Sequence, residues 1–320
     1  MQRNVAVTTA SFLPDGDTGS PRPGSAESGA ELDPETRCVY LDALGALRQA
    51  GVEFLTGGAH ALAPYTGIVR DTKDLDVFVR KEEDFESALA VLGAAGFATE
   101  LTFPHWLAKA YAGDRFIDLM FGASNGVAMV DDLWFTHAAP GRVLGVSVLL
   151  CPPEEMIWSK AFIMERERYD GADVAHLILA CGRELDWRRL LGRFGRRWRV
   201  LLSHLVLFGF IYPGEWAVIP DAVMAHLLRR LDRERVGSGE EARVCDGTLL
   251  SRQQYLVDVI GRGYADGRLA PRGEMTAAEI AHWTAAIPTS PAPPPPARSP
   301  DLSMARWNGR PAPRARRRRR

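Results

Sequence analysis

Two aspartates inside a short apolar stretch, Asp74 and Asp76, constrain this chain more than any other feature. The stretch Leu75 to Val79 has the composition of a strand, and side chains of a strand point alternately to opposite faces. Both carboxylates are therefore predicted to lie on one face, while the apolar residues between them enter the core. Like charges side by side repel, and aspartate disfavours strands, so folding alone does not explain the pair. Carboxylate oxygens are the preferred ligands of Mg²⁺, and we expect a metal site here.

A pair of glycines, Gly57 and Gly58, ends an earlier strand candidate over residues 52–56. Because glycine has no Cβ, the backbone N–H groups of this turn can approach an anion closely. Thr56 adds a hydroxyl that suits a phosphate oxygen. A short helix that ends near Pro64 is expected to follow, and its N-terminus would favour negative charge. An anion site next to a pair of acids indicates phosphoryl or nucleotidyl transfer.

The order Gly57-Gly58 and then Asp74-x-Asp76 resembles the signature of the DNA polymerase β-like nucleotidyltransferase superfamily. It is most similar to the bacterial branch of antibiotic nucleotidyltransferases and AbiEii-type abortive-infection toxins. The resemblance implies an α+β nucleotidyltransferase fold, with a mixed β-sheet and flanking helices, followed by a helical C-terminal domain. It also implies Mg²⁺ as the cofactor and an NTP, such as ATP, as the substrate.

A third carboxylate is implied by the same resemblance, from a later strand that helps to bind metal and to deprotonate the acceptor hydroxyl. Asp118 matches it by position and by its apolar surroundings in the strand candidate 115–121. The preceding candidate, 106–112, joins this strand at Gly113-Asp114, which is a hairpin signal and places Asp114 at the turn. A single acid in such a strand can also face solvent, so the residues alone leave the role of Asp118 open.

Three basic residues are candidates for contact with the nucleotide phosphates. Arg70 and Lys73 directly precede the acid pair, where they either neutralise a triphosphate or face solvent. Lys160 lies on a predicted helix and is followed by arginines and aspartates, which is similar to a later motif of the AbiEii-like branch. That similarity implies a phosphate contact for Lys160. Asp170 and Asp173 fit equally well as N-caps of the next helix.

The predicted reaction follows from these residues. Asp74, Asp76 and Asp118 would hold two Mg²⁺ ions about 3.5–4 Å apart. A hydroxyl would attack the α-phosphorus of the NTP, and pyrophosphate would leave. The sequence contains no P-loop and no kinase-type H-R-D, which argues against those classes of enzyme.

Strand candidates concentrate in the first half of the chain and helix candidates in the second, which predicts an α+β domain followed by a helical domain. The expected divisions are a disordered leader (1–32), a catalytic domain (33–152), a helical domain (153–287) and a disordered Pro/Arg-rich tail (288–320). The remaining predicted strand is 143–150. The predicted helices are 34–50, 82–95, 154–167, 172–181, 186–210 with a break near Gly195, 220–233, 251–263 and 276–287, with a flexible loop at 236–247.

The formal net charge of −1 hides a strong asymmetry. Nine arginines and one acid between Arg298 and Arg320 give the tail +8 and leave −9 for the remainder. The run Arg314 to Arg320 either contacts nucleic acid or is a solvated end without function. Four widely spaced cysteines predict reduced thiols and a cytoplasmic protein. The most apolar run, Val200 to Tyr212, is too short for a bilayer and predicts a buried helix.

The residues do not specify the acceptor, for which RNA and a small molecule are both open. Two enzymatic variants of the hypothesis are an antibiotic-modifying transferase and the toxin of a toxin–antitoxin pair. The alternative from another class is a catalytically silent nucleotide-binding or interaction protein that keeps the fold.

Overall fold

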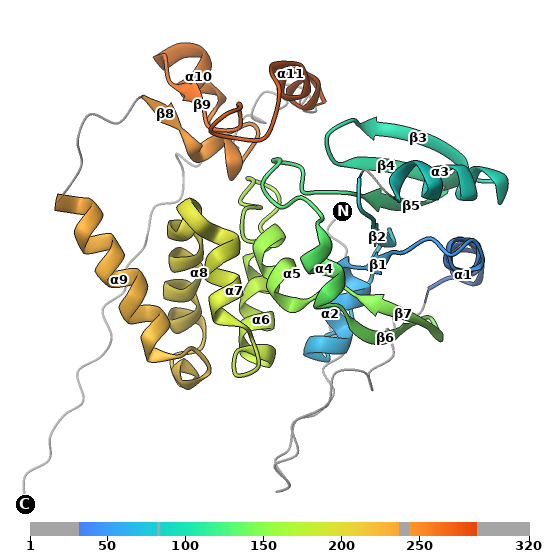
Figure 1. Ribbon diagram of the computed structural model, residues 1–320, viewed down its shortest axis with the longest axis horizontal. Helices are drawn as coiled ribbons and strands as arrows, with labels where there is room; N and C mark the ends of the chain where they lie inside the picture. Colours follow the sequence, from blue (N-terminus) through green and yellow to red (C-terminus); the bar gives the residue numbers. More distant parts are fainter. Residues whose placement is uncertain (1–31, 82–83, 237–242, 287–320) are drawn as a thin grey trace, which may run out of the picture. The chain divides into compact units, whose positions relative to one another are not determined.

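The computed structural model of the chain describes residues 32–81, 84–236 and 243–286 (Figure 1). The predicted leader, apart from Leu32, and the predicted Pro/Arg-rich tail lie outside the described residues.

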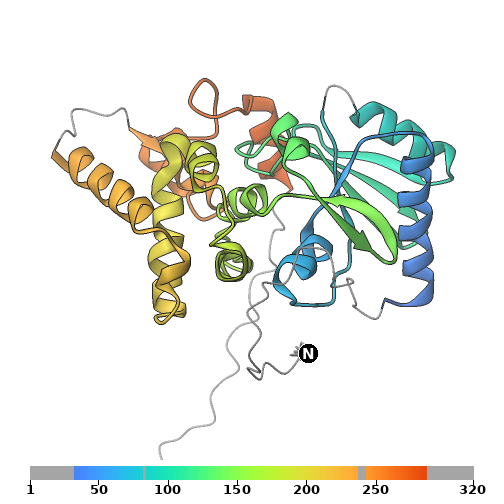
Figure 2. The ribbon, with the colours of Figure 1, turned by 60° about the horizontal axis from the view of Figure 1, so that its bottom comes forward.

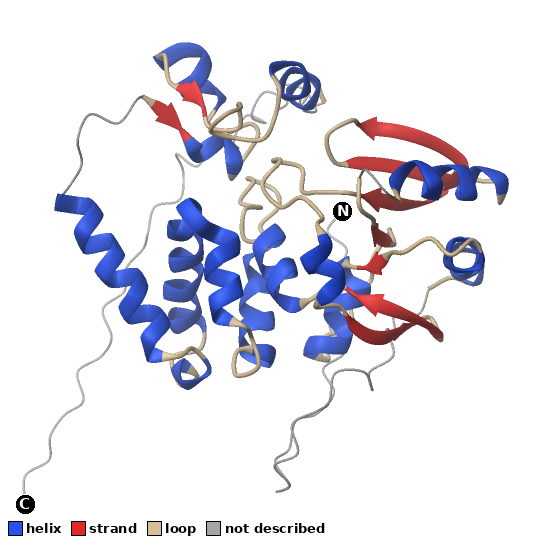
Figure 3. Cartoon of the chain, viewed as in Figure 1, coloured by secondary structure: helices blue, strands red, loops and turns tan. Residues whose placement is uncertain are grey.

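A seven-stranded mixed sheet forms the first half of the described chain, in the order β3-β4-β5-β2-β1-β7-β6 (Figure 3). The pairs β2–β5 and β1–β7 are parallel, and the other neighbours are antiparallel. The strands are β1 (Leu55–Thr56), β2 (Asp76–Phe78), β3 (Ala98–Phe103), β4 (Leu107–Ala112), β5 (Arg115–Met120), β6 (Ala139–Val143) and β7 (Val146–Leu150).

Helices flank this sheet and make up most of the second half, so the predicted α+β class is confirmed. The helices near the sheet are α1 (Pro34–Gln49), α2 (Gly58–Thr66), α3 (Phe85–Ala94) and α4 (Asp132–Thr136). The later ones are α5 (Pro153–Lys160), α6 (Gly171–Cys181), α7 (Trp187–Phe194), α8 (Trp198–Ile211), α9 (Asp221–Val236), α10 (Leu256–Arg262) and α11 (Ala277–Ala285). Three short 3₁₀ segments (195–197, 216–218 and 246–249) and the small pair β8 (Val244–Cys245) and β9 (Ala265–Asp266) complete the described elements.

The sheet separates two groups of helices (Figure 2). Helices α1 and α3 pack on each other on one side, and α2 packs on α6 on the side of the helical region. Buried residues of α1, including Leu44 and Leu47, join the sheet in one core. The helix begins as predicted, because the side chain of Asp33 accepts a hydrogen bond from the Thr36 N–H.

The edge strand β3, the short helix α4 and the strand β6 were not predicted. The strand β3 is mostly exposed and polar, so it lacks the apolar alternation that identifies a strand. The predicted strand 143–150 is confirmed over its second part as β7, but its start was wrong, because the chain turns at Leu144 and Gly145, both with positive φ, and forms a β6–β7 hairpin. A glycine at such a turn is the local signal that the prediction missed.

Several predicted boundaries also shift. Helix α2 continues through Pro64 to Thr66, because the proline removes only the one N–H that would bond to a carbonyl of the preceding turn. The helix ends at Gly67, whose backbone is in the left-handed region. The predicted helix 154–167 ends at Lys160, after which the chain forms a turn that pairs Met164 with Tyr169. Helix α10 starts at Leu256, later than predicted, and part of the predicted 236–247 loop forms β8.

The predicted break near Gly195 is confirmed, since α7 and α8 are separated there by a 3₁₀ turn. The apolar run at 200–212 is only half buried: Phe208 is fully covered, whereas Phe210 is 84% exposed. None of the helices in the described part of the chain has both the length and the apolar character that crossing a bilayer requires.

A buried charge network joins the start of α5 to α7. Glu155 is fully buried and accepts hydrogen bonds from both Arg189 and Arg193. Arg193 also pairs with Asp131, the N-cap residue of α4. The carboxylate of Glu155 thus links α5 to α7, and Arg193 extends the network to the start of α4.

Replacing Glu155 with alanine should lower the free energy of unfolding by about 3–5 kcal/mol, because it removes the fully buried carboxylate that the guanidinium groups of Arg189 and Arg193 share. Urea denaturation measures this loss. The matched control is Asp258→Ala, which removes an aspartate from an i,i+4 pair with the mainly exposed Arg262 and should cost under about 1 kcal/mol. Equal losses in the two variants would contradict a structural role for the buried network.

Candidate active site

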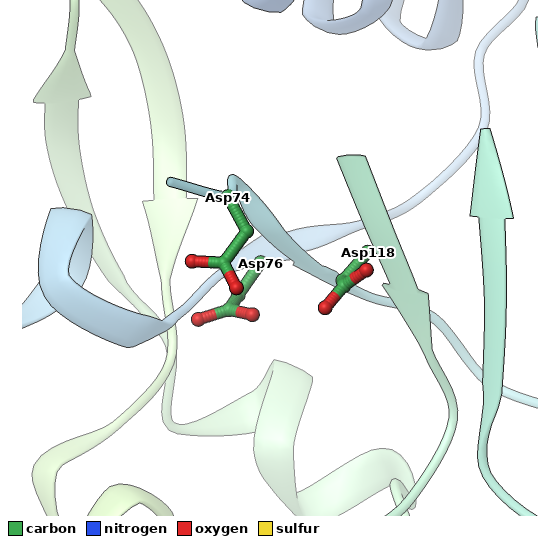
Figure 4. A group of neighbouring side chains, drawn as sticks. All are labelled: Asp74, Asp76 and Asp118. Atoms are coloured by element: carbon green, nitrogen blue, oxygen red, sulfur yellow. The ribbon is translucent and has the colours of Figure 1, made fainter. Parts of the chain in front are cut away.

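Three carboxylates meet at the centre of the sheet. In the parallel β2–β5 pair, Asp76 lies directly opposite Asp118, and Asp74 comes two residues before Asp76 (Figure 4). One ligand oxygen from each of the three lies within 4.8 Å of the other two. The structure therefore brings together the three acids singled out in the sequence, one from a strand more than forty positions away.

Asp118 is held from both sides of its strand. Its backbone N–H donates to the carbonyl of Leu75, the residue directly before β2, at 3.0 Å. On the other side, Lys109 of β4 lies opposite it, with Nζ 2.5 Å from Oδ1 of Asp118. Sequence reasoning missed Lys109, although the signal was present: the predicted turn at Gly113-Asp114 pairs residues 112 and 115, and continuing that register opposes 109 to 118.

The glycine pair lies directly against the acids. The N–H of Gly57 donates to the carbonyl of Asp76 at 2.9 Å, and Gly57 is the N-cap of α2. Gly58 has a φ of +55°, and a Cβ at this position would lie 1.7 Å from Oδ2 of Asp76. Only glycine lets the start of α2 come this close to the carboxylate, so the amino end of the helix and the acid pair form one unit.

Two threonines line the same region. Thr72 donates from its hydroxyl to Oδ1 of Asp74 at 2.7 Å, which orients that carboxylate. Thr56 is fully buried, and its hydroxyl has no hydrogen-bond partner among the described residues. A buried polar atom without a partner is costly, which is consistent with a ligand that completes its hydrogen bonding.

The predicted phosphate-binding cations lie in an ion-pair cluster with the start of α6. Arg70 makes two hydrogen bonds to Asp173, at 2.6 and 2.7 Å. Lys160 pairs with Asp173 at 2.8 Å and with Asp170 at 3.2 Å, and Arg168 also pairs with Asp170. The N-cap position of α6 is Asp170, but its side chain makes these ion pairs and no capping bond. Lys73, by contrast, is exposed to solvent.

The electrostatics of the three carboxylates reflect their crowding. Burial, followed by the charges of Asp74 and Asp118, raises the pKa of Asp76 to about 7. Burial also raises the pKa of Asp118, against the opposing effect of Lys109. Arg168 and Lys160 lie close enough to lower the pKa of Asp76. Without a further cation, Asp76 therefore keeps its proton at a pH at which the carboxyl of a surface aspartate is ionised.

Two residues beside the acids belong to the packing around them. Burial lowers the pKa of His60 to about 4, so its imidazole is neutral, and its ring packs edge-on against Tyr40 at 6.0 Å. Burial, with the nearby aspartates, raises the pKa of Tyr40 to about 12. Sequence reasoning did not single out Tyr40, whose side chain is fully buried in α1.

No protein-family model matches the sequence, and no curated protein sequence matches it significantly. Among solved structures, the antibiotic-resistance factor ANT(2'')-Ia matches with 18% identity over 54% of this chain and 98% of its own, at a TM-score of 0.38. A crystal structure of ANT(2'')-Ia with adenylyl-2''-tobramycin matches with 14% identity over 56% and 99%, at 0.32. An antigenic nucleotidyltransferase-like protein from Paracoccidioides brasiliensis matches with 14% identity over 55% and 94%, at 0.31. At this level of similarity, the matches carry no information about substrate.

Substituting Gly58 with alanine should weaken divalent-cation binding at least tenfold, because the added Cβ displaces the carboxylate of Asp76. The control is Gly67→Ala at the other end of the same helix, which has the same left-handed backbone and no atom within 4 Å of the added Cβ. Both variants should lose about 1–2 kcal/mol of stability through backbone strain, while only Gly58→Ala should lose cation affinity. Calorimetric titration with Mn²⁺ measures the affinity; unchanged binding by Gly58→Ala would contradict the predicted proximity.

The raised pKa of Asp76 predicts a pH-dependent stability of the metal-free protein. The contribution of this group is fully present below its ordinary pKa of 3.8 and is lost as the pH rises through about 7, because the buried carboxyl must then ionise. Urea denaturation in EDTA should therefore show a loss of roughly 1–4 kcal/mol between pH 4 and pH 8 that Asp76→Asn lacks. Identical pH profiles of the two proteins would show that Asp76 titrates normally.

Proposed function

We propose that this protein is a metal-dependent nucleotidyltransferase that moves a nucleoside monophosphate from an NTP to a hydroxyl acceptor and releases pyrophosphate. The observation that carries the proposal is the convergence of Asp74, Asp76 and Asp118 beside the glycine-opened start of α2. Carboxylates that lie this close together repel one another, so their convergence costs stability unless a cation binds between them.

The donor set fits a hard divalent cation. All three groups are carboxylates, which suit Mg²⁺ and Mn²⁺ better than softer metals. The raised pKa of Asp76 indicates a site that lacks compensating positive charge on its own. When bound by these residues, Mg²⁺ would supply charge neutralisation for the triphosphate and acidify the acceptor hydroxyl.

The residues around the acids supply the binding of the triphosphate. The backbone N–H groups at the start of α2 and the hydroxyl of Thr56 offer donors on one side. Lys160 and Arg168 offer positive charge on the helical side, and both act electrostatically on Asp76. Asp170 keeps these two cations in place by pairing with each of them. Arg70 is held on the same cluster through Asp173.

In the proposed reaction, Asp118 accepts the proton of the acceptor hydroxyl. A bond forms between that oxygen and the α-phosphorus, while the bond from the α-phosphorus to the pyrophosphate oxygen breaks. The role of the protein is to position these groups and to stabilise charge, without a covalent intermediate. We propose RNA or a small hydroxyl compound as acceptor and ATP as the first donor to test. The toxin role and the cytoplasmic location stay predictions.

Calorimetry with each NTP and Mg²⁺ tests the proposal. The full-length protein should bind an NTP only with Mg²⁺, and Asp74→Asn/Asp76→Asn should bind it at least a hundredfold more weakly because both carboxylate charges are lost. The matched control is Asp71→Asn, which removes an exposed carboxylate from the same loop and should leave binding unchanged. If no NTP binds to any of the three proteins, the chain is not an NTP-dependent transferase.

A further inference from the structure

We infer that Lys109 takes the place of one of the two cations expected at this site, so that the protein binds a single divalent ion beside a fixed ammonium group. The inference rests on the proposed function, because it concerns the same three carboxylates. It replaces the two-ion arrangement that was predicted from the sequence. In the new arrangement, Asp74 and Asp76 hold one ion, and Lys109 lies on the β4 side of Asp118.

The backbone fixes the position of this lysine. Across three neighbouring strands, β4, β5 and β2, the residues Lys109, Asp118 and Asp76 lie opposite one another in one row of the sheet. Side chains of directly opposed residues leave the same face of a sheet about 5 Å apart. The ammonium is therefore a neighbour of Asp118 because of strand register, which does not change when a side chain rotates.

An aromatic ring holds the ammonium from a second direction. Phe116 precedes Asp118 by two residues on β5 and so projects from the same face. The Nζ of Lys109 lies 3.8 Å from the centre of this ring, in a cation–π contact, and bonds to Oδ1 of Asp118. The side chains of Lys109 and Asp118 are only 19% and 12% exposed, so water screens the pair weakly.

The charges favour one divalent ion. Among the groups carried by β4, β5 and the stretch 74–76, three carboxylates and one ammonium leave a formal charge of −2, which a single divalent cation neutralises. Lys160 and Arg168 lie on the helical side and pair with a further carboxylate, that of Asp170. A second divalent ion at Asp118 would lie next to the ammonium and be repelled by it. A carboxylate has two oxygens, so Asp118 can keep Lys109 on Oδ1 and still offer Oδ2 to the bound ion or to the acceptor proton.

This arrangement gives Lys109 a positioning role in the reaction. The ammonium orients Asp118 and places a fixed positive charge on the side of the site where the acceptor oxygen would gain negative charge. An ammonium keeps its charge and its distance from the strand, whereas a loosely bound second ion would exchange with solvent.

The test is Mn²⁺ titration of the full-length, metal-free protein, followed by electron paramagnetic resonance of free and bound Mn²⁺. The protein and Lys109→Arg should each bind one ion. Lys109→Met, which keeps the length of the side chain but removes the charge, should bind a second ion at least tenfold more tightly and show the signal of a spin-coupled pair. The matched control is Lys81→Met, because Lys81 also lies over a phenylalanine ring, that of Phe121. This control protein should bind one ion.

Each outcome decides the inference. Two coupled ions in the unaltered protein, or no gain of a second ion in Lys109→Met, would overturn it and leave the proposed metal-dependent function standing. A lack of Mn²⁺ binding in every variant would overturn the inference together with the proposed function. Urea denaturation of Lys109→Met shows whether it is folded. If it is not, Lys109→Gln gives the same comparison, because it also removes the charge and its amide can still donate a hydrogen bond to Asp118.

Discussion

Repulsion among three closely placed carboxylates is the constraint on which the rest of this structure depends. The parallel pairing of β2 with β5 forces Asp76 against Asp118, and the strand alternation adds Asp74 to the same face. Burial, followed by the charges of Asp74 and Asp118, raises the pKa of Asp76 to about 7, so the ionised carboxylate is unfavourable in the metal-free protein. A site with this cost is understandable if its purpose is to bind positive charge.

The surrounding structure compensates this repulsion from two directions. On the sheet, Lys109 pairs with Asp118, and on the helical side Lys160 and Arg168 lower the pKa of Asp76. The two contributions differ in kind. The lysine on the sheet is fixed by strand register, whereas the cations of the helical side are shared with Asp170, so a phosphate can compete for them. We therefore assign the first to the acid cluster and the second to the nucleotide.

Ion pairs also connect the helical region to the segments that flank the sheet. The buried Glu155 joins α5 to α7, and Arg193 of α7 reaches back to Asp131 at the start of α4. Arg70 anchors the loop before the acid pair to Asp173 on α6. Ion pairs thus connect the loop that carries the acids to the helices that carry the cations.

The sequence by itself determined the acid pair, the glycine turn and the α+β class, because strand alternation, missing Cβ atoms and apolar periodicity are local properties. It also contained the hairpin register that pairs Lys109 with Asp118. Tertiary structure alone decided the meeting of Asp118 with Asp76, since parallel strands far apart in the chain carry no local signal of their register. It likewise decided that Lys160 lies among carboxylates and that polar β3 joins the sheet, because both depend on contacts that only the folded chain makes.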